Sequence, residues 1–102
     1  MRFVVSGQSM EPSFMAGDKL FVSKLVYKFI KPGVGDVVVV SDPRDGRRVL
    51  KRVSRVVSGE YFVTGDNLAM STDSRKFGMV PKGTILGKVI WRYGKSIDKG
   101  NL

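Results

Sequence analysis

Residues 36–57, DVVVVSDPRDGRRVLKRVSRVV, constrain the fold more than any other part of the chain. Two valine-rich runs, 36–43 and 49–57, flank an Asp-Gly pair, which is the dipeptide most typical of a tight hairpin turn. Because β-branched residues favour strands, the segment predicts two antiparallel strands joined by a turn at 44–48.

Other short apolar runs are bounded by turn residues in the same way and predict further strands. They lie at 3–5, 21–30, 60–67 and 84–93. In 21–30, Lys24 and Lys28 alternate with apolar residues, which indicates a strand or hairpin arm with one wet face.

Residues 68–78 have no clean period, and we expect a loop there with room for one helical turn, whereas 94–102 reads as a frayed tail. The pattern predicts an all-β fold with little helix over one domain, 1–102, built from antiparallel sheets as a sandwich or a partly closed barrel.

The chain contains no His and no Cys. This excludes a Ser-His-Asp triad, a thiolate nucleophile, disulfides and metal sites made of imidazole or thiolate. No Asp-rich loop with calcium-binding spacing is present either. We therefore expect neither a metal nor another cofactor.

The net charge is +9, from 18 basic and 9 acidic residues, and it favours an anionic partner such as a membrane surface, an acidic protein or nucleic acid. A basic cluster crowds the predicted hairpin: Arg44, Arg47, Arg48, Lys51, Arg52 and Arg55. A non-enzymatic basic β-domain is thus an alternative reading. Aromatic residues do not interleave with this cluster, so nucleic acid is not the favoured partner.

Ser9 lies in the turn of VVSGQSMEPSF, residues 4–14, where a serine is ordinary turn chemistry. In the strand 49–57 a period of two places Lys51 between Val49 and Val53 on the more apolar face. Burial there would lower the pKa of Lys51 and make it a base for Ser9. The alternative is a lysine that reaches solvent, and alternation alone favours that alternative.

Four motifs then occur in order across residues 6–81: SGQSMEPSF with a following Gly-Asp, KPGVGDVVVV, LKRV and GDNLAMSTDSRKFGMVP. A strand of the type GKVIWRY comes next. Together they resemble the signal peptidase I family of serine proteases with a Ser/Lys dyad. The resemblance reverses the preference for an exposed Lys51.

The resemblance implies a role for each matching residue. Ser9 would be the nucleophile and Lys51 the general base. Ser71 would orient the Lys51 ammonium, and Asp73 and Arg75 would form a charged brace that holds this loop.

The resemblance also implies an oxyanion hole and a substrate pocket. The backbone N–H of Ser9 would be one oxyanion donor. Some members carry a donor Ser two residues earlier, where this chain has Gly7, so the second donor is unassigned. Met10, Phe14 and Leu20 would help to line a small apolar pocket, and the family prefers small residues at the first and third positions before the cut.

The absence of His matches the bacterial or mitochondrial branch that uses Lys. The chain is also similar to the small soluble members known as maturation proteases for nickel superoxide dismutase. The implied partner is a precursor protein or its leader peptide, with the oligomeric state open.

The longest apolar run is VVVV at 37–40, far short of the roughly 20 residues that a spanning helix needs. The expected location is the cytoplasm if Met1 is the native start. Otherwise the protein would be membrane-associated and face the extracytoplasmic side. The related peptidase domain of self-cleaving repressors would need an attached DNA-binding domain, and none is evident.

Overall fold

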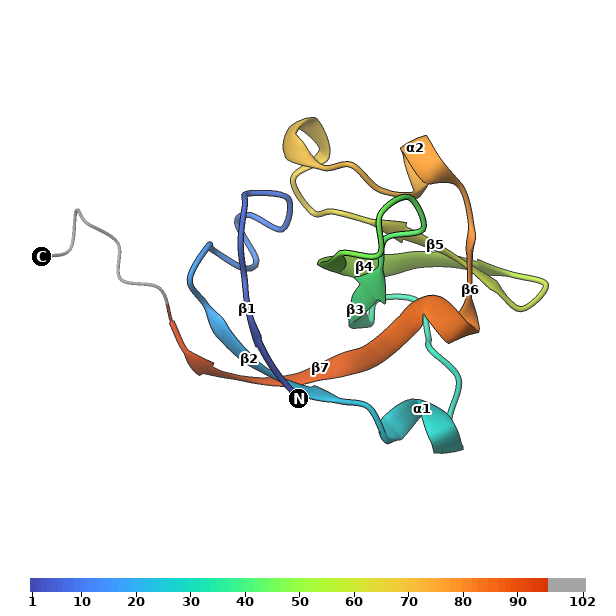
Figure 1. Ribbon diagram of the computed structural model, residues 1–102, viewed down its shortest axis with the longest axis horizontal. Helices are drawn as coiled ribbons and strands as arrows, with labels where there is room; N and C mark the ends of the chain where they lie inside the picture. Colours follow the sequence, from blue (N-terminus) through green and yellow to red (C-terminus); the bar gives the residue numbers. More distant parts are fainter. Residues whose placement is uncertain (96–102) are drawn as a thin grey trace, which may run out of the picture.

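The computed structural model describes residues 1–95, in which seven strands account for most of the regular structure (Figure 1). The strands are β1 (Arg2–Val4), β2 (Lys19–Ser23), β3 (Val37–Ser41), β4 (Arg48–Val57), β5 (Glu60–Thr64), β6 (Val80–Pro81) and β7 (Ile85–Gly94). The helical turns are α1 (Val26–Phe29), η1 (Leu68–Met70), α2 (Ser74–Phe77) and η2 (Lys82–Thr84). The predicted all-β fold with little helix is confirmed.

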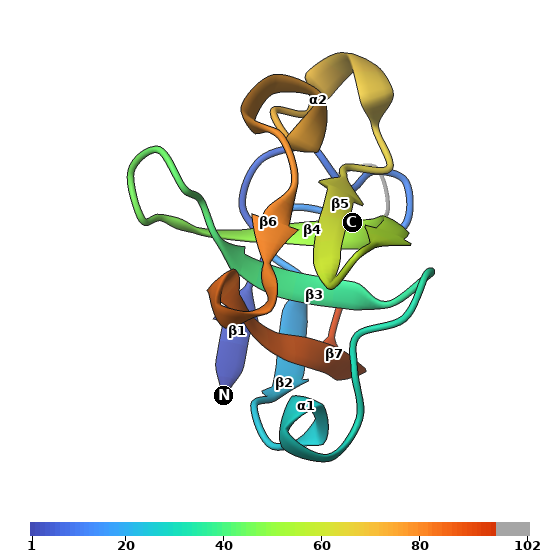
Figure 2. The same ribbon diagram turned by 90° about the vertical axis from the view of Figure 1, so that its right-hand side faces the viewer.

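The seven strands form one antiparallel sheet in the order β1-β2-β7-β3-β4-β5-β6. Figure 2 shows how strongly the sheet twists, because β1 and β2 run across the direction of β3 and β4. Within residues 1–95, β1 and β6 are the two edges and do not pair, so the sheet is open rather than closed into a barrel.

The β3–β4 hairpin matches its prediction. Its register runs from Val37 opposite Arg52 to Ser41 opposite Arg48. Asp42 N–H donates to the Arg47 carbonyl at 2.8 Å and closes the turn. Local turn chemistry was therefore enough to locate this pair of strands.

The predicted strand at 21–30 was wrong beyond Ser23, because the chain turns there into α1. The Ser23 hydroxyl accepts a hydrogen bond from Val26 N–H at 3.2 Å, and Tyr27 is buried. Lys24 and Lys28 are four residues apart, a spacing that suits one face of a helix as well as one face of a strand.

Two helical turns, η1 and α2, lie in the 68–78 loop, where one was expected. The expected tail, 94–102, falls outside the described residues apart from its first two positions, and Gly94 is the last residue of β7.

The core consists of two apolar clusters on opposite faces of the sheet. The first comprises Tyr27, Val38, Val40, Val53, Tyr61, Val63, Val80 and Ile85. The second comprises Val5, Met10, Leu20, Val22, Val39 and Leu50. Since the valines of β3 alternate between the clusters, β3 is buried on both faces. The second cluster ties the segment after β1 to β4 through Met10 and Leu50, which brings Ser9 to the first half of β4.

Candidate active site

A small pocket of about 60 Å³ lies between the segment around β1 and the start of β4. Its lining residues are Phe3, Val5, Ser6, Ser9, Met10, Arg48, Val49, Leu50 and Lys51. Ser9 and Lys51, distant in sequence, thus line the same cavity.

The loop that carries Ser9 is held at its base and at its tip. At the base, Val5 and Asp18 are joined by a backbone hydrogen bond of 2.9 Å. At the tip, Asn67 N–H donates to the Ser9 carbonyl at 2.8 Å. The backbone N–H of Ser9 itself donates to no residue in the described part of the chain. This leaves a fixed donor beside the Ser9 hydroxyl.

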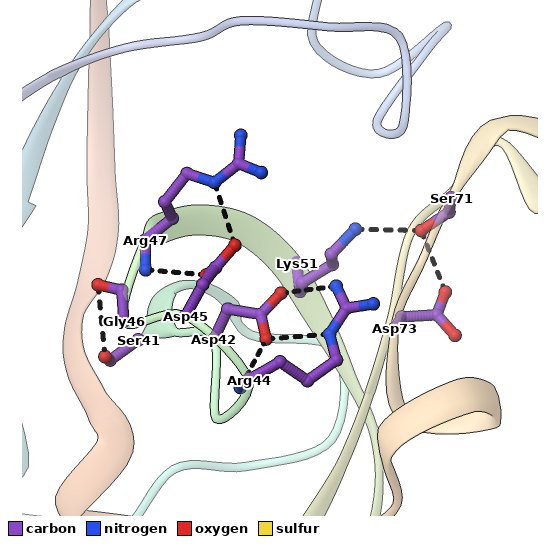
Figure 3. Close-up of polar contacts among 9 residues, drawn as sticks. All are labelled: Ser41, Asp42, Arg44, Asp45, Gly46, Arg47, Lys51, Ser71 and Asp73. Atoms are coloured by element: carbon purple, nitrogen blue, oxygen red, sulfur yellow. Dashed lines mark hydrogen bonds and ion pairs between the residues drawn. The ribbon is translucent and has the colours of Figure 1, made fainter.

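Lys51 is only 3% exposed and is fixed by a chain of hydrogen bonds (Figure 3). Its Nζ donates to Ser71 Oγ at 2.8 Å, and Ser71 Oγ donates to Asp73 Oδ2 at 2.9 Å. Burial lowers the pKa of Lys51, against the opposing pull of the Asp73 and Asp42 carboxylates. The result is an amine that gives up its proton more readily than an exposed lysine.

Asp73 is fully buried and stays ionised because its oxygens are saturated with donors. Arg75 donates from Nε to Oδ1 and from Nη2 to Oδ2, both at 2.9 Å, and Gly65 N–H donates to Oδ2 at 2.9 Å. Burial would raise the pKa of Asp73, but these hydrogen bonds outweigh it and hold the pKa well below its usual range. The expected ion pair between Asp73 and Arg75 is present.

A second Asp-x-Arg pair repeats this geometry on the other side of Lys51 (Figure 3). Arg44 donates from its backbone N–H and from Nε to Asp42 Oδ1 at 2.9 and 3.0 Å, and from Nη2 to Oδ2 at 2.7 Å. Its guanidinium also lies 5.5 Å from the ring centroid of Phe77 in α2. This pair therefore links the β3–β4 turn to the helix that follows Asp73. Sequence reasoning missed it, although the spacing 42–44 repeats that of 73–75.

Gly65 lies between the loop that carries Ser9 and the loop that carries Ser71. A Cβ atom at this position would collide with the Ser71 side chain and with the Ser9 carbonyl oxygen. Only glycine lets the 65–67 turn approach both groups so closely. The sequence places this glycine at the start of the fourth motif but gives no signal for its contacts.

The residues predicted for the oxyanion hole and the substrate pocket do not all lie near Ser9. Met10 lines the pocket beside Ser9, and Gly7 lies in the same loop with φ of 76°. Leu20 is fully buried in the second core cluster. Phe14 lines a separate, open hollow, where the Arg92 guanidinium lies 5.4 Å from its ring centroid. The structure does not bring Phe14 and Leu20 into the lining of the Ser9 pocket.

The basic cluster of the hairpin is largely neutralised. Arg44, Arg47 and Arg52 pair with Asp42, Asp45 and Asp66 at 2.7, 2.9 and 2.8 Å. Lys51 is buried, so only Arg48 and Arg55 of the cluster are both outside the core and without a carboxylate partner within residues 1–95. This pattern disfavours phosphate binding at the hairpin. Among the same residues, no group of three or more acidic side chains could hold a metal ion.

Comparison with known proteins gives the class to which this fold and pocket belong. Residues 1–55 and 54–94 match the family described as "Signal peptidase, peptidase S26", so the chain is a peptidase of the signal peptidase type. The match covers nearly the whole chain, and the protein belongs to the S26 family.

Three relatives illustrate the range of the family. Mitochondrial ATP-independent inner membrane protease subunit 1a of Arabidopsis thaliana is 38% identical over 112 residues, covering 86% of this chain and 67% of the relative. Mitochondrial inner membrane protease subunit 1 of Homo sapiens is 32% identical over 118 residues, covering 95% and 71%. Probable signal peptidase I-1 of Synechocystis sp. is 27% identical over 143 residues, covering 96% and 73%. In residues 1–95 of this chain, no helix is long and apolar enough to cross a membrane.

Proposed function

We propose that the protein is a serine endopeptidase that removes an N-terminal leader from a precursor, with Ser9 as nucleophile and Lys51 as general base. The observation that carries the proposal is the almost complete burial of Lys51 in the pocket that Ser9 also lines. A buried lysine without a carboxylate in direct contact is costly for the fold, so a position of this kind points to chemistry.

Each proton has a donor and an acceptor in this mechanism. Neutral Lys51 takes the proton of Ser9 Oγ as the oxygen attacks the scissile carbonyl carbon. The Lys51 ammonium then protonates the leaving amine as the peptide bond breaks and leaves an acyl-enzyme on Ser9. Lys51 next takes a proton from water, the resulting hydroxide attacks the ester, and the returned proton restores Ser9.

Ser71 acts on this mechanism through Lys51. Its hydroxyl accepts from Nζ at 2.8 Å and donates to Asp73, which fixes the direction of the lysine. In the described chain no hydrogen bond joins Lys51 Nζ to Ser9 Oγ. The proposal therefore requires these two atoms to come within hydrogen-bond distance when substrate fills the pocket.

The tetrahedral intermediate needs donors for its negative oxygen. The uncommitted backbone N–H of Ser9 is one, and a preorganised donor of this kind lowers the barrier by about 3 kcal/mol. Gly7 has no side-chain hydroxyl to add, so this proposal leaves the second donor unassigned.

The substrate is proposed to bind as an extended strand. β1 is an edge of the sheet, and β4 pairs with β5 only from Arg52 onward, so Arg48–Lys51 present a second free edge. Both edges border the pocket, and an added peptide strand would satisfy their backbone groups. A volume of about 60 Å³ is roughly two water molecules, which suits an alanine or serine side chain before the cut.

The test is cleavage of peptides that span leader junctions, with the new N-terminus read by mass spectrometry. Ser9→Ala and Lys51→Arg should each abolish turnover, because the arginine cannot be deprotonated. Ser41→Ala and Lys76→Arg are the matched controls outside the pocket and should retain activity. Cleavage that survives in Lys51→Arg would refute the base assignment.

The pocket predicts the substrate class more finely. Replacing Ala by Phe immediately before the cut should lower kcat/KM at least a hundredfold, since the ring cannot enter. The precursor of a nickel superoxide dismutase, suggested by the sequence resemblance, is one proposed substrate and should be cut at the end of its short leader. Equal cleavage of the Ala and Phe peptides would contradict the proposed pocket.

A further inference from the structure

A second surface stands out on the segment between β2 and β3. Residues 24–34, called the α1 surface here, expose four large apolar side chains: Leu25, Phe29, Ile30 and Val34. Phe29 is 85% exposed, more than any other exposed large apolar residue in the described chain. Single exposed apolar residues are common, but four within ten positions form a patch that needs a partner.

The same segment is purely basic. From Lys19 to Gly35 the sequence has four lysines and no acidic residue. Lys24, Lys28 and Lys31 are all exposed, and no ion pair in residues 1–95 involves them. Exposed apolar side chains therefore alternate with unneutralised positive charges.

The α1 surface is held rigidly against the sheet. Tyr27 is buried in the first core cluster, and its hydroxyl donates to Asp36 Oδ2 at 2.7 Å. Gly33 N–H donates to the same oxygen at 3.0 Å, and Lys88 of β7 lies 3.5 Å from the other Asp36 oxygen. The inward anchor turns the flanking apolar side chains outward, so their exposure is built into the fold.

This surface is separate from the candidate active site. In Figures 1 and 2, α1 lies at the bottom of the molecule, on the opposite side from α2 and the loop that carries Ser71 and Asp73 at the top. None of its residues lines the pocket of Ser9.

We propose that the α1 surface docks on an anionic lipid bilayer. Phe29, Ile30 and Leu25 would enter the boundary between headgroups and acyl chains, while the three lysines contact lipid phosphates and carboxylates. Charge selects this occupant over a second copy of the chain, because self-association would bring the same lysines together. The arrangement is that of an interfacial anchor and does not span the membrane.

The test is cosedimentation of the whole chain with vesicles of phosphatidylcholine alone and with about one third phosphatidylserine. Binding should require the anionic lipid. Lys28→Glu should weaken it about twenty-five-fold, counting one lost attraction and one new repulsion of about fivefold each. Phe29→Ser should weaken it about tenfold, through lost apolar burial.

Matched variants separate the α1 surface from general charge and hydrophobicity. Lys76→Glu in α2 makes the same charge change at the other end of the molecule, and Val57→Ser removes an exposed apolar group from β4. Both should bind vesicles within about twofold of wild type, and all four variants should cleave a soluble peptide normally. Equal losses for Lys28→Glu and Lys76→Glu would overturn the proposal. It would also be overturned by a wild-type dimer, measured by sedimentation, that Phe29→Ser dissociates while vesicle binding is unchanged.

Discussion

Replacing Lys51 by methionine tests whether the buried lysine serves catalysis or the stability of the fold. Methionine fills a similar volume without a charge, and the neighbouring groups keep their partners. Asp73 retains Arg75 and Gly65, Asp42 retains Arg44, and the Ser71 hydroxyl still donates to Asp73. The substitution therefore leaves no buried carboxylate unpaired.

The expected change in free energy follows from two opposing terms. The variant loses the hydrogen bond from Lys51 to Ser71, about 2 kcal/mol when the donor is charged. It also removes the penalty for burying an ammonium group, which is several kcal/mol in protein interiors. We expect Lys51→Met to unfold with a free energy about 1 kcal/mol above that of wild type at pH 7, while peptide cleavage is lost.

The pH dependence provides an independent check on Lys51. Burial lowers its folded pKa below the ordinary value of 10.5, so between these two values the unfolded chain binds more protons. Wild-type stability then rises with pH across this window, and the methionine variant lacks this rise. Its advantage should be largest near pH 7 and should shrink toward pH 10.

The assay is urea unfolding followed by circular dichroism at pH 7 and pH 9.5, with the slope m compared between the two proteins. A Lys51→Met variant more than about 2 kcal/mol less stable than wild type at pH 7 would refute the reasoning. That result would mean that the Lys51 charge stabilises the fold and is not a burden accepted for catalysis.

Three further perturbations test the surroundings of the site. Gly65→Ala should reduce kcat at least a hundredfold, because the added methyl group would push this turn away from Ser71 and Ser9. The control Gly83→Ala has open space around it and should change the free energy of unfolding by less than about 0.5 kcal/mol. A normal kcat in Gly65→Ala would contradict the close approach. Asp73→Asn should lower the free energy of unfolding at pH 7 by about 2 kcal/mol, measured by urea titration, because its arginine partner is partly exposed. Since the folded pKa of this carboxyl is lowered, wild type should lose that stability as the pH falls below about 3.8, and the asparagine variant should not. Arg44→Ala should lower kcat with little change in KM and should increase the rate of thermal inactivation. Arg47→Ala removes an exposed ion pair and should behave as wild type. Equal behaviour of the two variants would exclude a role for the second Asp-x-Arg pair.

Sequence reasoning succeeded where local chemistry decides the structure. The Asp-Gly turn and the flanking valines specified the β3–β4 hairpin, and the alternation along β4 placed Lys51 on the same face as Val53 of the first core cluster. The burial itself was not predictable from alternation, because a lysine at such a position more often reaches solvent. The family motifs supplied that information.

The sequence-based predictions failed where contacts between separate segments of the chain determine the structure. The strand predicted through 21–30 ends at Ser23, and Tyr27 of α1 donates its hydroxyl to Asp36, which lies outside the predicted strand. The contacts of Gly65 with two separate loops, and the second Asp-x-Arg pair beside Lys51, exist only once the sheet has assembled. No periodicity in the sequence predicts these tertiary contacts.

The hydrogen bond from Asn67 to the Ser9 carbonyl has a consequence for when the chain can become reactive during folding. Ser9, Lys51 and the 65–73 loop come from three distant stretches, so the site forms only once the long-range contacts of the sheet are made. A partly folded chain would carry a serine and a lysine no more reactive than free amino acids. Under the proposed mechanism, the appearance of turnover after dilution from denaturant would thus time the final closure of the sheet.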